Sequence, residues 1–266
     1  MDRSDRLEAA LRHDRIIVLA ALAGIVALAW GNMLHEARGM QQTGVCQCLG
    51  MAMSGPDTKQ WAVAAITPLF LMWAEMMVAM MIPSAAPMIL TFARVNRQRR
   101  EQDRPFVPSS LFLLGYLVVW GGFSLAASLA QWALHGTALL SPMMTSSSPV
   151  LGGVLLISAG AFQWTPWKRA CLNHCRSPLS FLLDGWREGR MGALAMGVRH
   201  GAYCTGCCWL LMVLLFVAGV MNMLWVAVIT LLVLLEKVLP QGMRFSTVVG
   251  VVFVAWGAWM IGARWF

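Results

Sequence analysis

The sequence predicts an all-α protein, a polytopic membrane helix bundle of about seven transmembrane helices. Hydrophobic residues make up 59% of the 266 residues and charged residues only 12%, whereas about one quarter of a soluble domain is charged. The mean hydropathy is +0.66. A soluble domain of this length still exposes much of its surface, so it could not hide this much apolar side chain. The composition excludes a cytosolic enzyme. We expect a single domain over 1–266 whose surrounding partner is the lipid bilayer.

The first two spans follow from uncharged runs of about 20 residues, the length that crosses the hydrocarbon layer. Span 1 covers 16–34 and follows four arginines. A cleaved signal peptide is the alternative, but the run is too long for a signal core and has no clear cleavage site. Span 2 covers 61–82, and Glu75 is its one charge.

The stretch 105–167 contains no Asp, Glu, Lys or Arg and is too long for a single crossing. The polar segment 135–149 divides it into two spans. We place span 3 at about 109–134 and span 4 at about 150–165, each close to the length that a bilayer requires.

The stretch 203–235 is also uncharged and would form a helix about 50 Å long. It must therefore turn, and a turn at 219–222 makes it a hairpin of spans 5 and 6. Span 7 covers about 245–263.

The basic residues indicate the orientation. Of the 20 Lys and Arg residues, only Arg38, Lys59 and Arg264 fall in the segments placed outside. Cytoplasmic loops carry an excess of basic residues, so we expect the N-terminus inside and the C-terminus outside in a bacterial inner (cytoplasmic) membrane. Lys168 and Lys237 count as loop charges here. The net charge of +8 is then a topology signal, together with attraction to anionic lipid, and no nucleic-acid partner is expected.

Sulfur is abundant, with 20 Met and 7 Cys. In span 2, Met72, Met76 and Met80 recur at every fourth position and share a helix face, which Glu75 borders. A carboxylate inside a membrane span is costly and signals function by default. The alternative is a Glu that is protonated or bonded to a neighbouring helix. We expect Glu75 to face the bundle interior near the sulfur groups of span 5.

Span 5 contains three cysteines at helical spacing. Cys204, Cys207 and Cys208 stand at i, i+3 and i+4, Met212 extends their face, and His200 precedes them by one turn. Buried cysteine is also an ordinary small hydrophobe. Three thiols beside an intramembrane histidine nevertheless indicate a ligand set.

The cytoplasmic loop between spans 4 and 5 adds Cys171, His174 and Cys175, and nearby Lys168, Arg169 and Arg176 would favour thiolate over thiol. On the outer side, Met143 and Met144 lie between spans 3 and 4, and Cys46 and Cys48 lie between spans 1 and 2. Soft ligands therefore occur outside, within and inside the membrane.

Thiolate and thioether ligands favour Cu(I), and another transition metal is the alternative. Zinc would more often be held by Cys, His and carboxylate without thioethers. A glycine-rich phosphate loop, a Ser-His-Asp order and a haem-attachment motif are absent from the sequence, as is the phosphorylation machinery of a metal-pumping ATPase.

Ordered segments from span 2 to span 6 carry a resemblance. They include WAEMMVAMMIPS at 73–84, SPMM at 141–144, AGAFQWTPWK at 159–168, HGAYCTGCCW at 200–209 and GVMN at 219–222, with matches at 171–172, 175–178 and 236–237. The region, about 61–240, resembles an uncharacterised bacterial family described as predicted metal-binding integral membrane proteins. That resemblance implies a membrane fold and metal binding by Met and Cys, with no established reaction. Trp167 stands where the family has an aliphatic residue, and Cys46 and Cys48 lie outside the match.

The leading hypothesis is a membrane protein that binds, delivers or transports Cu(I) by ligand exchange between these clusters. Its partners would be the metal ion and either a metallochaperone or another membrane subunit. A membrane thiol oxidoreductase would need accessible low-pKa thiolates and leaves the methionines unused. A membrane metalloenzyme would need open coordination positions. A purely structural or partner-anchoring membrane protein is the remaining alternative. We assign no catalytic residue.

Overall fold

The computed structural model describes residues 3–43, 61–100, 102, 107–136, 149–220 and 222–263. All regular structure in these ranges is helical, which confirms the all-α prediction. The helices are α1 (Arg3–Thr43), α3 (Trp61–Arg100), α4 (Ser109–Gly136), α5 (Pro149–Phe162), α6 (Pro166–Arg176), α7 (Pro178–Asp184), α8 (Gly189–Val213), α9 (Leu215–Ala218), α10 (Met223–Val238) and α11 (Gly242–Gly262).

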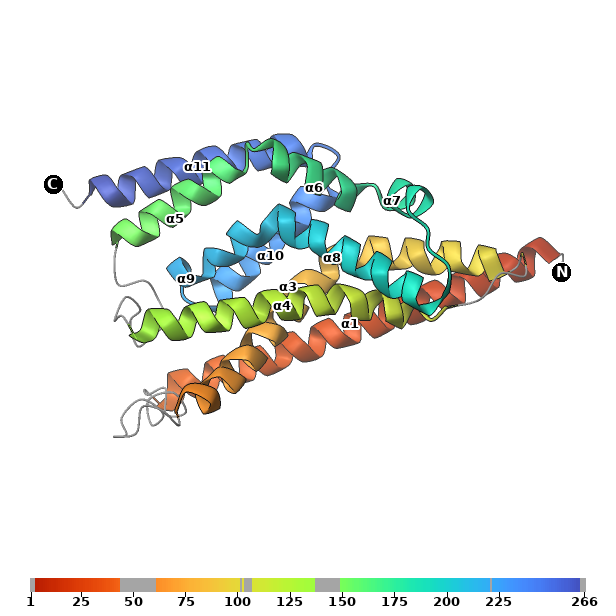
Figure 1. Cartoon of the computed structure of the whole chain (residues 1–266), viewed down its shortest axis with the longest axis horizontal. Coiled ribbons are helices and arrows are strands. Elements are labelled where there is room, and N and C mark those ends of the chain that lie inside the picture. Colours follow the sequence, from red (N-terminus) through yellow and green to blue (C-terminus); the bar gives the residue numbers. More distant parts are fainter. Residues whose placement is uncertain are drawn as a thin grey trace.

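The long helices run roughly along one axis of the molecule (Figure 1). Helices α1, α3 and α4 lie along one side, α5 and α11 form a pair on the other, and α8 and α10 lie between them. Helix α1 begins at one end of the long axis and α11 ends at the opposite end, an arrangement that an odd number of crossings requires.

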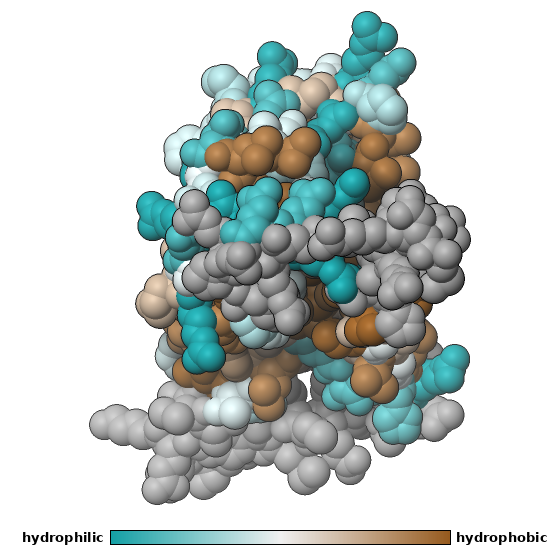
Figure 2. Space-filling view, turned by 90° about the vertical axis from the view of Figure 1, so that its right-hand side faces the viewer, coloured by the Kyte–Doolittle hydropathy of each residue, from teal (hydrophilic) through white to brown (hydrophobic). Residues whose placement is uncertain are grey.

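Within the described residues, five helical segments are long and apolar enough to cross a membrane, namely Arg15–Gly39, Ile66–Arg99, Ser109–Ala133, Gly189–Ala218 and Gly242–Gly262. Large apolar side chains such as Leu28 (77% exposed) and Trp259 (69%) cover their outer faces. Helices α5 and α10, which correspond to spans 4 and 6, have 14 and 16 residues, fewer than the roughly 20 that a crossing takes. The seven-span count stays a prediction. Figure 2 shows the end where α3 stops and α8 starts, with hydrophilic and hydrophobic side chains side by side.

Helix α3 continues well beyond residue 82, the predicted end of span 2. The helix is not interrupted at Pro83 or Pro87, which both lie inside it. Pro83 has no N–H to donate to the carbonyl of Ala79. The indole N–H of Trp30 on α1 donates to that carbonyl instead, at 3.3 Å. Such replacement donors are how membrane helices tolerate proline.

Close backbone packing fixes α8 in the bundle. A Cβ added to Gly115 of α4 would collide with the backbone of Leu194, and one added to Gly197 of α8 would collide with the carbonyl of Phe112. Small residues let membrane helices approach closely in this way. The contact holds the first half of α8 against α4 and so places the cysteines that follow it.

The predicted loop between spans 4 and 5 is largely helical, which corrects the sequence prediction. Helix α6 begins after Thr165, whose hydroxyl accepts from the backbone N–H of Lys168 at 3.3 Å. Thr165 followed by Pro166 is a strong helix-start signal, so the start of α6 could have been predicted from the sequence. The turn predicted between spans 5 and 6 is present, and Gly219 adopts φ 93° there.

A buried polar network joins α5, α6, α10 and α11. The ammonium of Lys168 pairs with Glu236 at 2.7 Å and donates to the side-chain carbonyl of Gln163, which also accepts from Ser246 at 2.7 Å. Lys168 is 1% exposed and Lys237 is 8% exposed. The prediction that both are loop charges at the membrane surface is therefore wrong, because partners from other helices hold them inside the protein.

Candidate metal site

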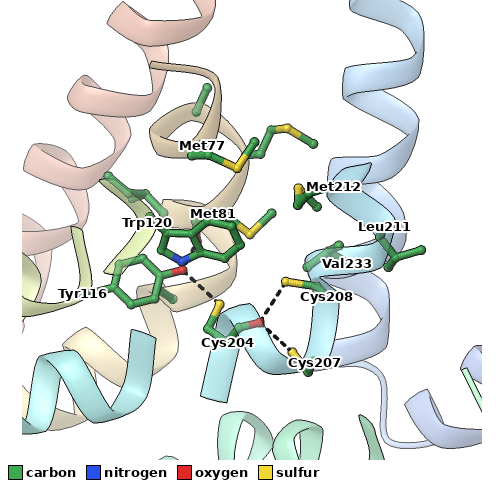
Figure 3. Close-up of a cluster of buried hydrophobic side chains, with 14 of the residues drawn as sticks. Met77, Met81, Tyr116, Trp120, Cys204, Cys207, Cys208, Leu211, Met212 and Val233 are labelled. Atoms are coloured by element: carbon green, nitrogen blue, oxygen red, sulfur yellow. Dashed lines mark hydrogen bonds between the residues drawn. The ribbon is translucent and has the colours of Figure 1, made fainter. Parts of the chain in front are cut away.

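Three buried cysteines lie at the centre of α8. Cys204, Cys207 and Cys208 are at most 1% exposed. Because residues three and four apart share a helix face, the thiols of Cys207 and Cys208 both reach back to the carbonyl of Cys204, at 3.1 and 2.9 Å (Figure 3). Both are free thiols, as is Cys204.

The sulfur of Cys204 contacts polar groups from two other helices. The ammonium of Lys237 on α10 lies 2.9 Å from its sulfur, and the hydroxyl of Tyr116 on α4 lies 3.1 Å from it. Lys237 also donates to Ser84 of α3 at 2.9 Å. An adjacent ammonium favours the thiolate over the thiol, so Cys204 is the sulfur in the best position to carry a negative charge.

Helix α6 brings a second pair of cysteines to the same place. Cys171 packs on Gly206 of α8, and Cys175, one turn further along α6, packs against the buried core that contains Cys204 and Cys207. The sequence predicted two separate stations, one inside the membrane and one in a loop. The structure instead forms one group, called the sulfur cluster below, which consists of Cys171, Cys175, Cys204, Cys207 and Cys208.

The expectation that the loop thiols are thiolates is wrong. The hydrogen bonds with the Cys204 and Cys207 sulfurs, together with burial, raise the pKa of Cys175 well above its ordinary value. Burial also raises the pKa of Cys171. The neighbouring cations have other partners, since Lys168 pairs with Glu236 and Arg176 donates to the carbonyls of Leu239 and Pro240.

Methionine thioethers border the sulfur cluster, and Met212 is the one among them that the sequence singled out. Met77 and Met81 of α3 and Met212 of α8 lie beside it (Figure 3), and all three are buried. The carbonyl of Met81 also accepts from Tyr116 at 3.2 Å. Of the predicted stripe, Met76 and Met80 are buried in the core and Met72 is partly buried.

Glu75 does not face the sulfur cluster, which corrects the prediction made for it. Its carboxylate accepts from the side-chain amide of Asn32 on α1 at 2.9 Å. Ser84, which touches Lys237, lies nine residues further along α3 and therefore about 180° around the helix from Glu75. The Glu75 face of α3 is covered by α1 because Asn32 offers a polar partner there.

His200 is buried one turn before Cys204, and both of its ring nitrogens lack a hydrogen-bond partner. The ring is stacked between Phe112 and Tyr116, with centroid distances of 6.0 and 5.5 Å, and Phe181 meets it at 5.8 Å. A buried polar group without a partner is rare in native structures. Its lone pair is available to a ligand.

His174 lies on the exposed side of α6 and stacks on Tyr203 at 4.3 Å. Its Nδ1 lies 2.8 Å from the carbonyl of Ala170. A carbonyl only accepts, so Nδ1 carries the proton and Nε2 keeps its lone pair. This is the usual way in which a metal-binding imidazole is oriented.

Among the residues that the structure describes, no three His, Cys, Asp or Glu side chains are already arranged around one ion position. The thiols of Cys207 and Cys208 point at their own helix backbone and must turn to become ligands. Met143, Met144, Cys46 and Cys48 lie outside the described residues.

Sequence reasoning missed Lys237 and Tyr116. Lys237 follows the apolar run of α10 without any intervening turn residue, which is a signal that it belongs to the helix. Tyr116 is one of only two tyrosines in the chain and lies in an uncharged span. A lone tyrosine hydroxyl in a span needs a buried partner, so its position was an available clue.

Residues 70–260 match the model of the PpoB2 family, which is described as a copper chaperone. That range includes the whole sulfur cluster and Met77, Met81, Tyr116, His200 and Lys237. No curated protein and no solved structure matches this chain.

Proposed function

This chain belongs to the PpoB2 family, which is described as a copper chaperone, and we propose that it holds Cu(I) in the sulfur cluster and hands it to a partner. The family match supports copper handling. We propose in addition which residues hold the copper ion, that the ion is Cu(I), and by which route it moves.

The observation that carries the proposal is the packing of α6 on α8, which sets Cys171 against Gly206 and Cys175 against the core that contains Cys204 and Cys207. Thiols from two helices meet where thioethers of Met77, Met81 and Met212 lie close by. Soft sulfur ligands favour Cu(I), which is content with few ligands, whereas zinc is usually held by four.

The proposed exchange surface is α6. Cys171 and Cys175 are partly exposed and His174 is exposed, while the cysteines of α8 are buried. Cargo that arrives at the His174 Nε2 and Cys171 side of α6 would move to Cys175 and then to Cys204 by replacing one ligand at a time. A metallochaperone or another membrane subunit would dock on the same side. The unpartnered ring of His200, one turn from Cys204, offers the next position.

We also propose that the protein is embedded in the bacterial inner membrane with its N-terminus inside. The five long apolar helices support membrane insertion. The basic residues of the sequence support the orientation.

Metal analysis of the detergent-purified full-length protein tests the proposed function. Loaded under reducing conditions with equal amounts of Cu(I) and Zn²⁺, the protein is expected to retain about one copper ion per chain and little zinc, because the ligands are sulfur and few. Iron or zinc in place of copper, or no retained metal, would contradict the proposal.

A further inference from the structure

Lys237 is a buried cation that contacts a cysteine sulfur and forms no ion pair with a carboxylate among the described residues. It is 8% exposed, and its ammonium contacts the sulfur of Cys204 and the hydroxyl of Ser84, both at 2.9 Å. The ion pairs within the described residues are Arg99 with Glu188 and Lys168 with Glu236, so Lys237 takes part in neither. A buried ammonium without a counter-charge is strongly unfavourable, and the thiolate of Cys204 is the group placed to supply that charge.

The carboxylate next to Lys237 in sequence does not change this balance. Glu236 turns toward Lys168, 2.7 Å away, and the two form a neutral pair. Successive residues of a helix point about 100° apart, which separates the two charges of the Glu236–Lys237 pair. One positive charge therefore remains beside the sulfur cluster.

We infer that Lys237 makes the site select a monovalent metal ion over a divalent one. It supplies one fixed positive charge beside two thiolates, so the site is neutral only when the bound ion carries a single charge. This inference rests on the proposed function, because it assumes that Cys204 and one further thiol of the sulfur cluster hold the ion. Without metal, the Lys237 ammonium and the Cys204 thiolate sum to zero. When Cu(I) binds, the second thiol, which is that of Cys175 or Cys207, loses its proton to solvent and becomes a thiolate ligand. One monovalent cation replaces one proton, and the site stays neutral.

A divalent ion breaks that balance. Two thiolates, one ammonium and a divalent ion leave one positive charge uncompensated inside the protein. Unit charges a few ångströms apart at an effective dielectric constant near 20 change an equilibrium constant by roughly a hundredfold or more. Lys237 thus discriminates against Zn²⁺ by charge, in addition to the preference of soft ligands for Cu(I).

The test compares metal preference in purified full-length variants. Lys237→Met removes the charge and keeps an aliphatic stem of similar length, and Lys237→Arg keeps the charge. Ser84→Asp places a carboxylate beside Lys237 and neutralises it without removing it, with Ser84→Ala as its matched control. Cu(I) affinity is measured by competition with a chromophoric Cu(I) chelator. Divalent binding is measured with Co²⁺ through its thiolate absorption and by displacement with Zn²⁺.

Lys237→Met and Ser84→Asp are expected to lower the ratio of Cu(I) to Zn²⁺ affinity by about 100-fold. Lys237→Arg and Ser84→Ala should stay within about tenfold of the parent. If Lys237→Met does not fold, Ser84→Asp against Ser84→Ala decides the question. An unchanged ratio in the neutralised variants, or an equal loss in Lys237→Arg and Lys237→Met, would overturn the inference. A parent protein that binds no Cu(I) would instead overturn the proposed function.

Discussion

Replacing Cys204, Cys207 and Cys208 together by serine is expected to lower Cu(I) affinity by a factor of roughly 1,000 or more. The substitution leaves Cys171 and Cys175 on α6 but removes every sulfur that they meet on α8. A serine hydroxyl is a hard, neutral ligand and a poor substitute for a thiolate toward Cu(I). The measurement is competition against a Cu(I) chelator, with copper per chain determined after gel filtration.

Replacing a single methionine gives a reference for the size of that loss of Cu(I) affinity. Met81→Leu should weaken Cu(I) binding only partly, since a thioether is a weaker ligand that borders the sulfur cluster. Met191→Leu is the matched control. Met191 is 75% exposed, so this variant should bind copper with the affinity of the parent protein. A triple serine variant with parental affinity would place the copper site outside the sulfur cluster.

Replacing Glu236 by leucine is expected to lower the free energy of unfolding in detergent by about 3 kcal/mol or more. The substitution leaves the ammonium of Lys168 buried, 1% exposed, with Gln163 as its remaining partner. Breaking one side of a buried ion pair costs more than replacing both sides by apolar groups. The double variant Lys168→Met with Glu236→Leu should therefore recover much of the loss.

An exposed ion pair gives the matched control. Arg99 and Glu188 are 3.2 Å apart, with side chains 35% and 52% exposed. Removing this pair by Glu188→Ala should change the free energy of unfolding by less than about 1 kcal/mol. Equal effects of Glu236→Leu and Glu188→Ala on the denaturation midpoint would contradict the role assigned to the buried network.

The sequence was sufficient for the helical class because uncharged runs and helical spacing are local properties. It was also sufficient to select Cys204, Cys207 and Cys208 as a group, since three thiols at i, i+3 and i+4 must share a face. The sequence could not predict which residues of other helices contact each helix face. Glu75 looked like a candidate for the sulfur cluster, but Asn32 of α1 meets it.

The joining of Cys171 and Cys175 to the cysteines of α8 depends on where α6 packs, and nothing in the spacing of its residues states that. The same holds for the buried cations. Lys168 and Lys237 flank apolar runs as ordinary loop charges do, and only partners 68 and 33 residues away in sequence, Glu236 and Cys204, explain their burial. Long-range contacts, rather than local pattern, complete the candidate site.

X-ray absorption at the copper edge of the loaded full-length protein tests the central claim most directly. The edge reports the oxidation state, and the fine structure reports the ligand atoms and their number. We expect monovalent copper with about two or three sulfur neighbours, and a loss of this sulfur shell in the Cys204/Cys207/Cys208 serine variant. Copper bound mainly by nitrogen or oxygen, or divalent copper in four-coordinate geometry, would contradict a Cu(I) site in the sulfur cluster.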